Sequence, residues 1–221
     1  MRSRLLQLVM SVLLLGLFSG MAVQEAAAVG TPELSGSWGW MWGGSASSRV
    51  GTFRLNSAAT YSGALSIPVG ALNWTEAHYT YQGSSMTLDG SGLFRPLTDI
   101  GIHYMQLAGL RGLRQGPVMP YVLGGIGTTY YSPSESFVDI NGTIYNLDSS
   151  WKLSFVLGAG LKVWLGEAEK VGLRLQFRAL PTLFNSSTGI WVGGGGGGVS
   201  VSGNAVWQFD VSAGVAIKLG G

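Results

Sequence analysis

The fold of this chain is decided by the stretch Ala205–Leu219, which reads AVWQFDVSAGVAIKL. Its odd positions from Trp207 onward are apolar, whereas its even positions from Gln208 onward are polar or small. A period of two is typical of a β-strand with one apolar face and one polar or small face. About ten residues of tilted strand cross a bilayer, and most strands of soluble sheets are about half as long as this stretch. The stretch therefore predicts a membrane-crossing strand that closes a β-barrel.

The N-terminus has the pattern of a targeting segment. Arg2 and Arg4 precede the apolar run Leu5–Val23, and small residues follow it. This order is typical of a secretory signal peptide with an A-x-A-like cleavage site. A membrane anchor helix is the alternative, but small residues interrupt the run and no basic stop-transfer cluster follows. We therefore expect residues 1–28 to be a signal peptide and residues 29–221 to be the barrel domain.

The composition agrees with an exported barrel of one domain. The chain has 36 glycines, only 11% charged residues and no cysteine, and its formal net charge is +2. Such a balanced charge gives no indication of nucleic-acid binding. Its mean hydropathy is positive, at +0.30, yet no apolar run after the N-terminal one is long enough for a spanning helix. Alternation in barrel strands dilutes apolar residues in this way, and a closed barrel is held by backbone pairing without disulfides.

Seven further segments alternate in the same manner. They are Ser35–Gly43, Ala59–Ile67, Leu72–Gln82, Ile102–Gly112, Val118–Tyr131, Lys152–Leu165 and Leu173–Arg178. We assign Trp38, Trp40, Phe155, Leu161 and Val211 to the lipid-facing side.

The links between the segments alternate in length. Long links are predicted at Gly44–Ala58, Gly83–Gly101, Ser132–Ser150 and Asn185–Asn204, and short turns at Pro68–Gly70, Gly112–Pro117 and Gly166–Lys170. Outer-membrane barrels have long outer loops and short periplasmic turns. The sequence thus predicts an all-β fold, an eight-stranded antiparallel up-and-down transmembrane β-barrel with both termini in the periplasm.

Aromatic residues gather at the segment ends next to the long links. Amphipathic rings favour the headgroup level of a membrane. We therefore predict an aromatic girdle made of Trp42, Tyr79, Tyr81, Tyr130, Trp151 and Trp207.

Three stretches carry a resemblance to a known family. PYVLGGIGTTYY (120–131), LSFVLGAGLKVWLGEAEKVGLRLQFRAL (153–180) and WQFDVSAGVAIKL (207–219) resemble small outer-membrane β-barrel proteins, the OmpA/OmpX-like and porin-family barrel domain. The resemblance implies a location in the outer membrane of a Gram-negative cell. It also implies contact with outer-membrane lipid and insertion by the barrel-assembly machinery. We expect no cofactor and a monomer, and the ligand of the surface loops is left open.

No catalytic, cofactor-binding or metal site is predicted. Gly193–Gly198 satisfies a G-x-G-x-x-G pattern without the strand and helix that a dinucleotide site needs, so we interpret it as a loop tip. His78 and His103 are assigned to opposite faces, which disfavours a shared metal site. Glu76 and His78 share a face with Thr80, so a lipid-modifying hydrolase or acyltransferase stays open as an alternative.

The polar faces of the strands predict what fills the barrel. The inward polar set is Glu76, His78, Lys152, Lys162, Arg174, Gln176, Arg178, Gln208 and Asp210. A barrel of about eight strands has little interior space beyond its own side chains. If Leu165 pairs with Val171, Lys162 falls opposite Arg174. If Leu183 pairs with Ala205 across the last long link, Arg178 falls opposite Asp210. We therefore expect a plug of paired charges and a structural or surface-interaction role. A narrow porin-like channel and a soluble periplasmic ligand-binding barrel are alternatives.

Overall fold

The computed structural model describes residues 30–48, 51–90, 93–134, 137–138, 144–145, 149–183, 188–191, 198–201 and 205–220. The predicted signal peptide, residues 1–28, lies outside the described residues, as does most of the glycine run at 193–198. Within the described part of the chain, no helix is long and apolar enough to cross a membrane.

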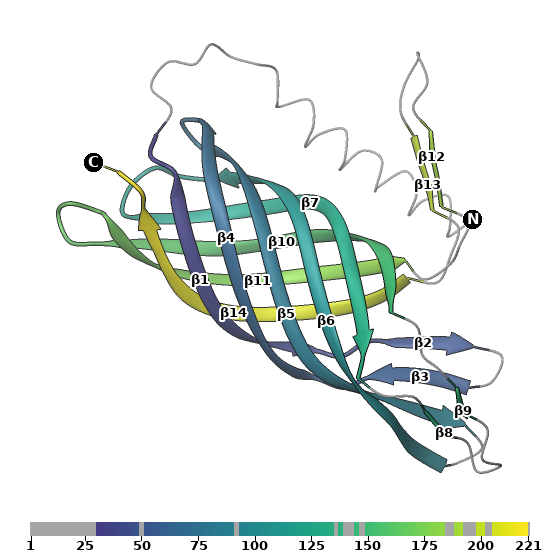
Figure 1. Cartoon of the computed structure of the whole chain (residues 1–221). Coiled ribbons are helices and arrows are strands. Elements are labelled where there is room, and N and C mark those ends of the chain that lie inside the picture. Colours follow the sequence, from purple (N-terminus) through teal and green to yellow (C-terminus); the bar gives the residue numbers. More distant parts are fainter. Residues whose placement is uncertain are drawn as a thin grey trace.

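The described residues form a closed antiparallel β-barrel of eight long strands (Figure 1). These strands are β1 (Glu33–Trp42), β4 (Ala58–Gly70), β5 (Asn73–Gly90), β6 (Leu93–Gly112), β7 (Val118–Pro133), β10 (Ser150–Leu165), β11 (Val171–Leu183) and β14 (Ala205–Lys218). Each strand pairs with its neighbour in this order, and β14 pairs with β1 to close the barrel. The predicted eight-stranded barrel is confirmed.

Among the described residues, six shorter strands lie in the connections. They are β2 (Ser45–Ser48), β3 (Gly51–Leu55), β8 (Phe137–Val138), β9 (Ile144–Tyr145), β12 (Thr188–Trp191) and β13 (Gly198–Val201). The short turns lie at one rim of the barrel, together with the start of β1 and the end of β14 (Figure 1). We call this rim the turn end. The opposite rim, where the longer connections lie, is the loop end.

Two predicted connections are wrong. The expected loop Gly83–Gly101 is mostly strand, because β5 and β6 stay paired from the barrel up to Gly90 and Leu93 and project beyond the loop-end rim (Figure 1). β3 adds to the same sheet by pairing with β5. Backbone pairing therefore continues past Gly83 and Gly101, the two glycines at which the sequence predicted the strands to end. The expected turn at Pro68–Gly70 is also displaced. β4 runs to Gly70, a register shift follows Pro68, and the turn is at residues 71–72. Proline has no donor for a ladder and is tolerated at such an irregularity.

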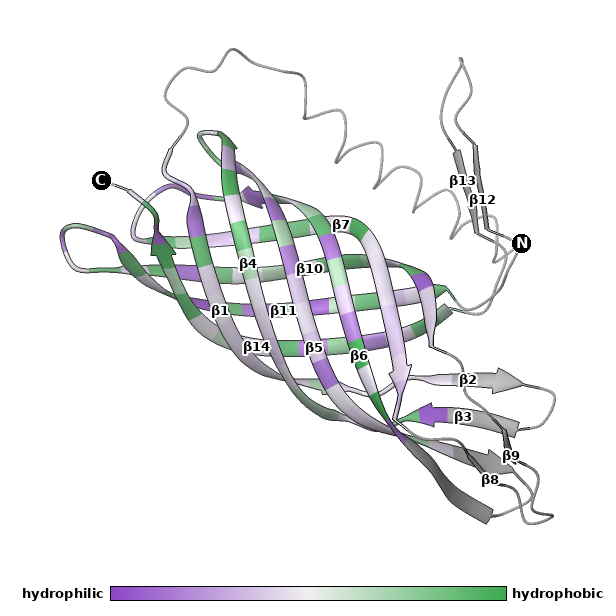
Figure 2. Cartoon of the chain, viewed as in Figure 1, coloured by the Kyte–Doolittle hydropathy of each residue, from purple (hydrophilic) through white to green (hydrophobic). Residues whose placement is uncertain are grey.

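The outer wall is apolar along the barrel, and hydropathy alternates along most strands (Figure 2). Trp38, Leu107, Leu175 and Val211 are among the exposed large side chains, with exposed fractions from 44% to 58%. Phe155 is the exception among the assigned lipid-facing residues, since it is buried. Its register partner Ile126 is exposed, so the outward face of β10 is still assigned correctly at this pair.

Glycine allows close contact between neighbouring strands at Gly160 in β10. A Cβ built at Gly160 would lie 2.4 Å from the carbonyl oxygen of Leu175 and 2.4 Å from the ring of Tyr121. We expect Gly160→Ala to lower the free energy of unfolding by about 1 to 3 kcal/mol, since an added methyl group must displace packed atoms. At Gly36 nothing lies within 4 Å of the added Cβ, so Gly36→Ala should be nearly neutral. Reversible urea unfolding in lipid vesicles measures both, and equal losses would contradict the steric argument.

Candidate functional site in the barrel interior

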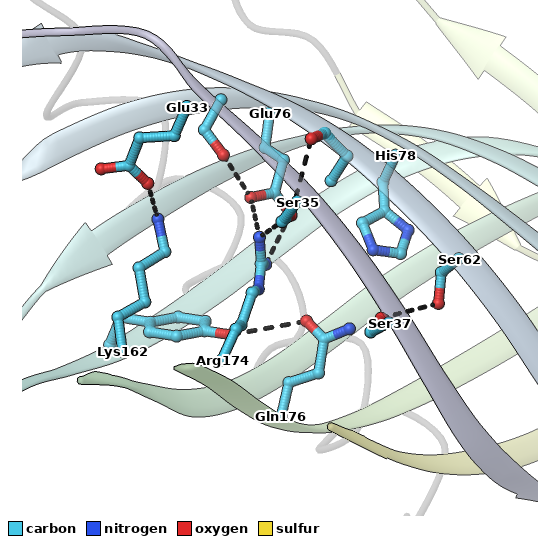
Figure 3. Close-up of polar contacts among 12 residues, drawn as sticks. Glu33, Ser35, Ser37, Ser62, Glu76, His78, Lys162, Arg174 and Gln176 are labelled. Carbon is cyan, nitrogen blue, oxygen red and sulfur yellow. Dashed lines mark hydrogen bonds and ion pairs between the residues drawn. The ribbon is translucent and has the colours of Figure 1, made fainter. Parts of the chain in front are cut away.

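Arg174 on β11 lies at the centre of the polar interior near the turn end. Its guanidinium donates from Nη1 and Nη2 to the two carboxylate oxygens of Glu76, each at 2.8 Å. Nε donates to the hydroxyl of Tyr121 at 3.0 Å, and Nη1 also reaches Ser35. Ser66 donates to the same carboxylate at 2.7 Å. Arg174 and Glu76 are each 1% exposed, so a desolvated ion pair crosses the interior from β11 to β5 (Figure 3).

Lys162 forms a second ion pair beside the first. The predicted pairing of Leu165 with Val171 is confirmed, and it places Lys162 opposite Arg174. Lys162 donates to the carboxylate of Glu33 on β1 (Figure 3). Each of the two adjacent cations therefore has its own acid. Glu33 was missed because the first predicted segment began at Ser35, although extending its alternation by one period would have included it.

Arg178 and Asp210 form a further layer towards the loop end. The predicted register that sets them opposite each other is confirmed. Arg178 donates to Asp210 Oδ2 from Nε at 3.0 Å and from Nη2 at 2.7 Å. Thr60 donates to Asp210 Oδ1 at 2.8 Å.

His78 is part of this layer. Arg178 Nη1 lies 2.8 Å from His78 Nδ1 and 3.1 Å from Thr80 Oγ1. Arginine has donors only, so the imidazole nitrogen that it meets must be an acceptor. Glu76 and His78 are therefore both occupied by buried arginines. The alternative of an acid and histidine pair that acts on lipid has no support in this geometry, because neither group faces a surface from which a substrate could approach.

The loop-end half of the interior contains a neutral hydrogen-bonded network and an apolar cluster. Tyr104 donates to Gln208, and Gln208 Nε2 donates to Gln82 Oε1 at 3.0 Å. The buried apolar residues around them are Met41, Ile100, Ile102, Tyr104, Tyr131 and Leu180. This cluster was not predicted, because only polar residues were assigned to the interior and Ile100 lies before the predicted fourth segment, which begins at Ile102.

The remaining residues of the predicted interior set lie at different depths. Gln176 is buried, and its Nε2 donates to Ser212 at 3.0 Å. Lys152 is half-buried near the loop end, opposite the fully buried Thr129.

The residues of the predicted girdle lie on the outer wall at the loop end. Trp42, Tyr79, Trp151 and Trp207 are exposed, whereas Tyr81 and Tyr130 are half-buried. His103 lies among these rings and accepts or donates a hydrogen bond of 2.8 Å between Nδ1 and the hydroxyl of Tyr79. His103 and His78 thus lie on opposite sides of the wall.

Two solved structures with a similar fold are outer-membrane barrels. Neisserial surface protein A is 17% identical, with a TM-score of 0.52 over 87% of this chain and 100% of that chain. The outer membrane protein OprG from Pseudomonas aeruginosa is 14% identical, with a TM-score of 0.56 over 87% of this chain and 98% of that one. The chain has the fold of the small outer-membrane β-barrel proteins. No protein-family model and no curated protein matches the sequence, so these likenesses support the fold alone.

Proposed function

We propose that this chain is an integral outer-membrane β-barrel protein with an interior closed to solutes and a structural or surface-interaction role. The main support is the interior, where three buried ion pairs and an apolar cluster occupy the space between the strands. The outer wall supports the membrane location, because a wall with large exposed apolar side chains and an aromatic rim suits hydrocarbon and headgroups better than water.

The orientation follows from the same proposal. The turn end faces the periplasm and the loop end faces the outside, as in other barrels with short turns at one rim. The chain would be exported through a signal peptide cleaved near residue 28, inserted by the barrel-assembly machinery, and stay monomeric in outer-membrane lipid. Cell fractionation tests the location, because an integral barrel stays with the outer membrane until detergent is added.

An inserted epitope tests the orientation. We expect an epitope placed between Gly194 and Gly195 to bind antibody on intact cells without loss of the barrel, because the sequence predicts a loop tip there and loop tips tolerate insertions. The matched control is the same epitope in the turn Gly166–Lys170, which should bind antibody only after the outer membrane is permeabilised. The reverse pattern in an assembled barrel would contradict the proposed orientation.

Conductance in planar bilayers tests the closed interior. We expect the wild-type protein to conduct little or no current, because side chains fill an eight-stranded barrel. Asp210→Asn should increase conductance by loosening the layer around Arg178, while Thr80→Ala, which leaves that ion pair intact, should change it less. Steady wild-type conductance that Asp210→Asn does not alter would favour the narrow porin-like channel.

A further inference from the structure

A polar groove of about 450 Å³ lies on the outer wall at the loop end. Its floor is where Gly83 of β5 pairs with Gly101 of β6. Both glycines take outward positions, because the neighbouring Gln82, Ser84 and Ile100 are buried. Two paired outward positions without side chains leave the wall hollow at this point.

The groove is lined by groups that exchange hydrogen bonds and by one aromatic ring. The ring belongs to Tyr81, and the polar groups are the amide of Asn56, the hydroxyls of Ser57, Ser85 and Ser134, and the carboxylate of Asp99. Asn56 Nδ2 donates to Ser85 Oγ at 2.8 Å, and the backbone N–H of Ser134 donates to the carbonyl of Asp99 at 2.9 Å. These bonds hold the rim of the groove in place before any ligand arrives.

The groove lies on the loop-end side of a row of four aromatic rings, and Tyr81 belongs to both. Tyr81 pairs with His103, His103 with Tyr130, and Tyr130 with Trp151, with ring centroids 5.1, 5.8 and 4.7 Å apart. Such a row is favoured at the headgroup level of a membrane. The groove lies next to this row, further towards the loop end, and opens on the outer wall. In the proposed orientation it would face the headgroups of the outer leaflet.

We propose that this groove binds a neutral saccharide, carried by the headgroup of an outer-leaflet glycolipid. A sugar ring has an apolar face that can stack on Tyr81, and its hydroxyls both donate and accept, which suits the carboxylate, amide and hydroxyl groups of the rim. The groove residues that the structure describes include a carboxylate and no lysine or arginine. Lysine and arginine are the side chains that usually recognise phosphate or sulfate, so a lining without them suits a neutral ligand better than an anionic one. The membrane source of the sugar rests on the proposed outer-membrane orientation, whereas the saccharide chemistry rests on the groove itself.

Two arms of one binding experiment separate the possible sources of the sugar. In the first arm, the full chain in detergent is tested against an array of neutral oligosaccharides. In the second, the chain in phosphatidylcholine vesicles is tested with the same oligosaccharides coupled to a lipid. We expect binding in the lipid arm at lower concentration, because the membrane holds the headgroup at the height of the groove.

Variants of the groove test the site. Gly101→Val should fill it and weaken binding by at least about tenfold. The added Cβ meets nothing closer than 3.5 Å, and urea unfolding of the variant checks that the barrel still folds. Asp99→Asn should weaken binding through the lost carboxylate, with Glu167→Gln in the exposed turn at the other rim as its control. Tyr81→Ala should do the same through the lost ring, with Trp207→Ala as its control.

The outcomes are distinct. Binding in the lipid arm that the groove variants weaken supports the glycolipid headgroup, and equal binding of the free sugars supports the same groove with a soluble glycan. No binding in either arm, or binding that Gly101→Val and Asp99→Asn leave unchanged in folded protein, overturns the proposal. Fractionation and epitope exposure test the membrane location without reference to the groove, so failure of one proposal is distinguishable from failure of the other.

Discussion

Glu76→Gln is expected to lower the free energy of unfolding by about 3 to 5 kcal/mol. Arg174 is 1% exposed and makes two bonds of 2.8 Å with the carboxylate of Glu76. The glutamine keeps the shape of the side chain but leaves the guanidinium buried without its countercharge. The free-energy cost of keeping that charge away from water is then uncompensated. This cost is larger than the cost of losing the hydrogen bonds alone. Reversible urea unfolding in lipid vesicles gives the value.

Two further variants make the reason for this loss testable. Glu169→Gln removes the acid of the exposed pair with Lys218, whose atoms are 3.4 Å apart with side chains 26% and 40% exposed. This variant should lose at most about 1 kcal/mol of unfolding free energy, because water screens exposed ion pairs. Combining Glu76→Leu with Arg174→Met should recover much of the stability, since apolar residues of similar volume can replace a buried pair. If the Glu76 and Glu169 variants lose equal stability, burial of the pair is not the cause.

The register between β10 and β11 was predictable because a short turn fixed it, unlike the register beside the displaced turn after β4. The length of the turn Gly166–Lys170 pairs Leu165 with Val171, and every later pair of β10 and β11 follows from it, including Lys162 with Arg174. A slip of one residue would have moved each side chain to the other face. No such constraint acted at Gly83–Gly101. There a glycine at each end indicated a loop, and only the pairing partners β3 and β6 reveal that the strand continues.

The interior was predictable between neighbouring strands and less so across the lumen. Arg178 and Asp210 lie opposite each other on adjacent strands, so counting residues from the loop was enough to pair them. Arg174 reaches Glu76 from β11 to β5, which are not neighbours. Alternation gives the face and the approximate height of a residue, but not which strand lies across a closed barrel. The apolar cluster around Met41 and Leu180 was missed partly for the same reason, because its members come from β1, β6, β7 and β11.

Val211→Arg is the second substitution with a large expected effect, at about 2 to 4 kcal/mol of lost unfolding free energy in lipid vesicles. Val211 lies mid-strand in β14, between Trp40 of β1 and Phe177 of β11, and all three side chains point outward. An arginine there would place its charge in hydrocarbon, far from either headgroup layer. The matched control is Ile217→Arg, which is on the same face of the same strand and is equally exposed, at 44%. Ile217 lies near the turn end, where the guanidinium of an introduced arginine can reach the membrane interface. Ile217→Arg should therefore lower the free energy of unfolding by only about 0 to 1 kcal/mol.

The difference between these two arginine variants separates a membrane barrel from a soluble one. In water, both positions face solvent, and an arginine would cost about the same small amount at either. In a bilayer, the cost depends on depth, because hydrocarbon solvates a charge poorly and headgroups solvate it well. Equal small losses would therefore favour the soluble periplasmic barrel and remove the main support for the membrane location. A larger loss at Val211 that appears in vesicles, and shrinks when the barrel is unfolded from detergent micelles, would tie the apolar wall to lipid.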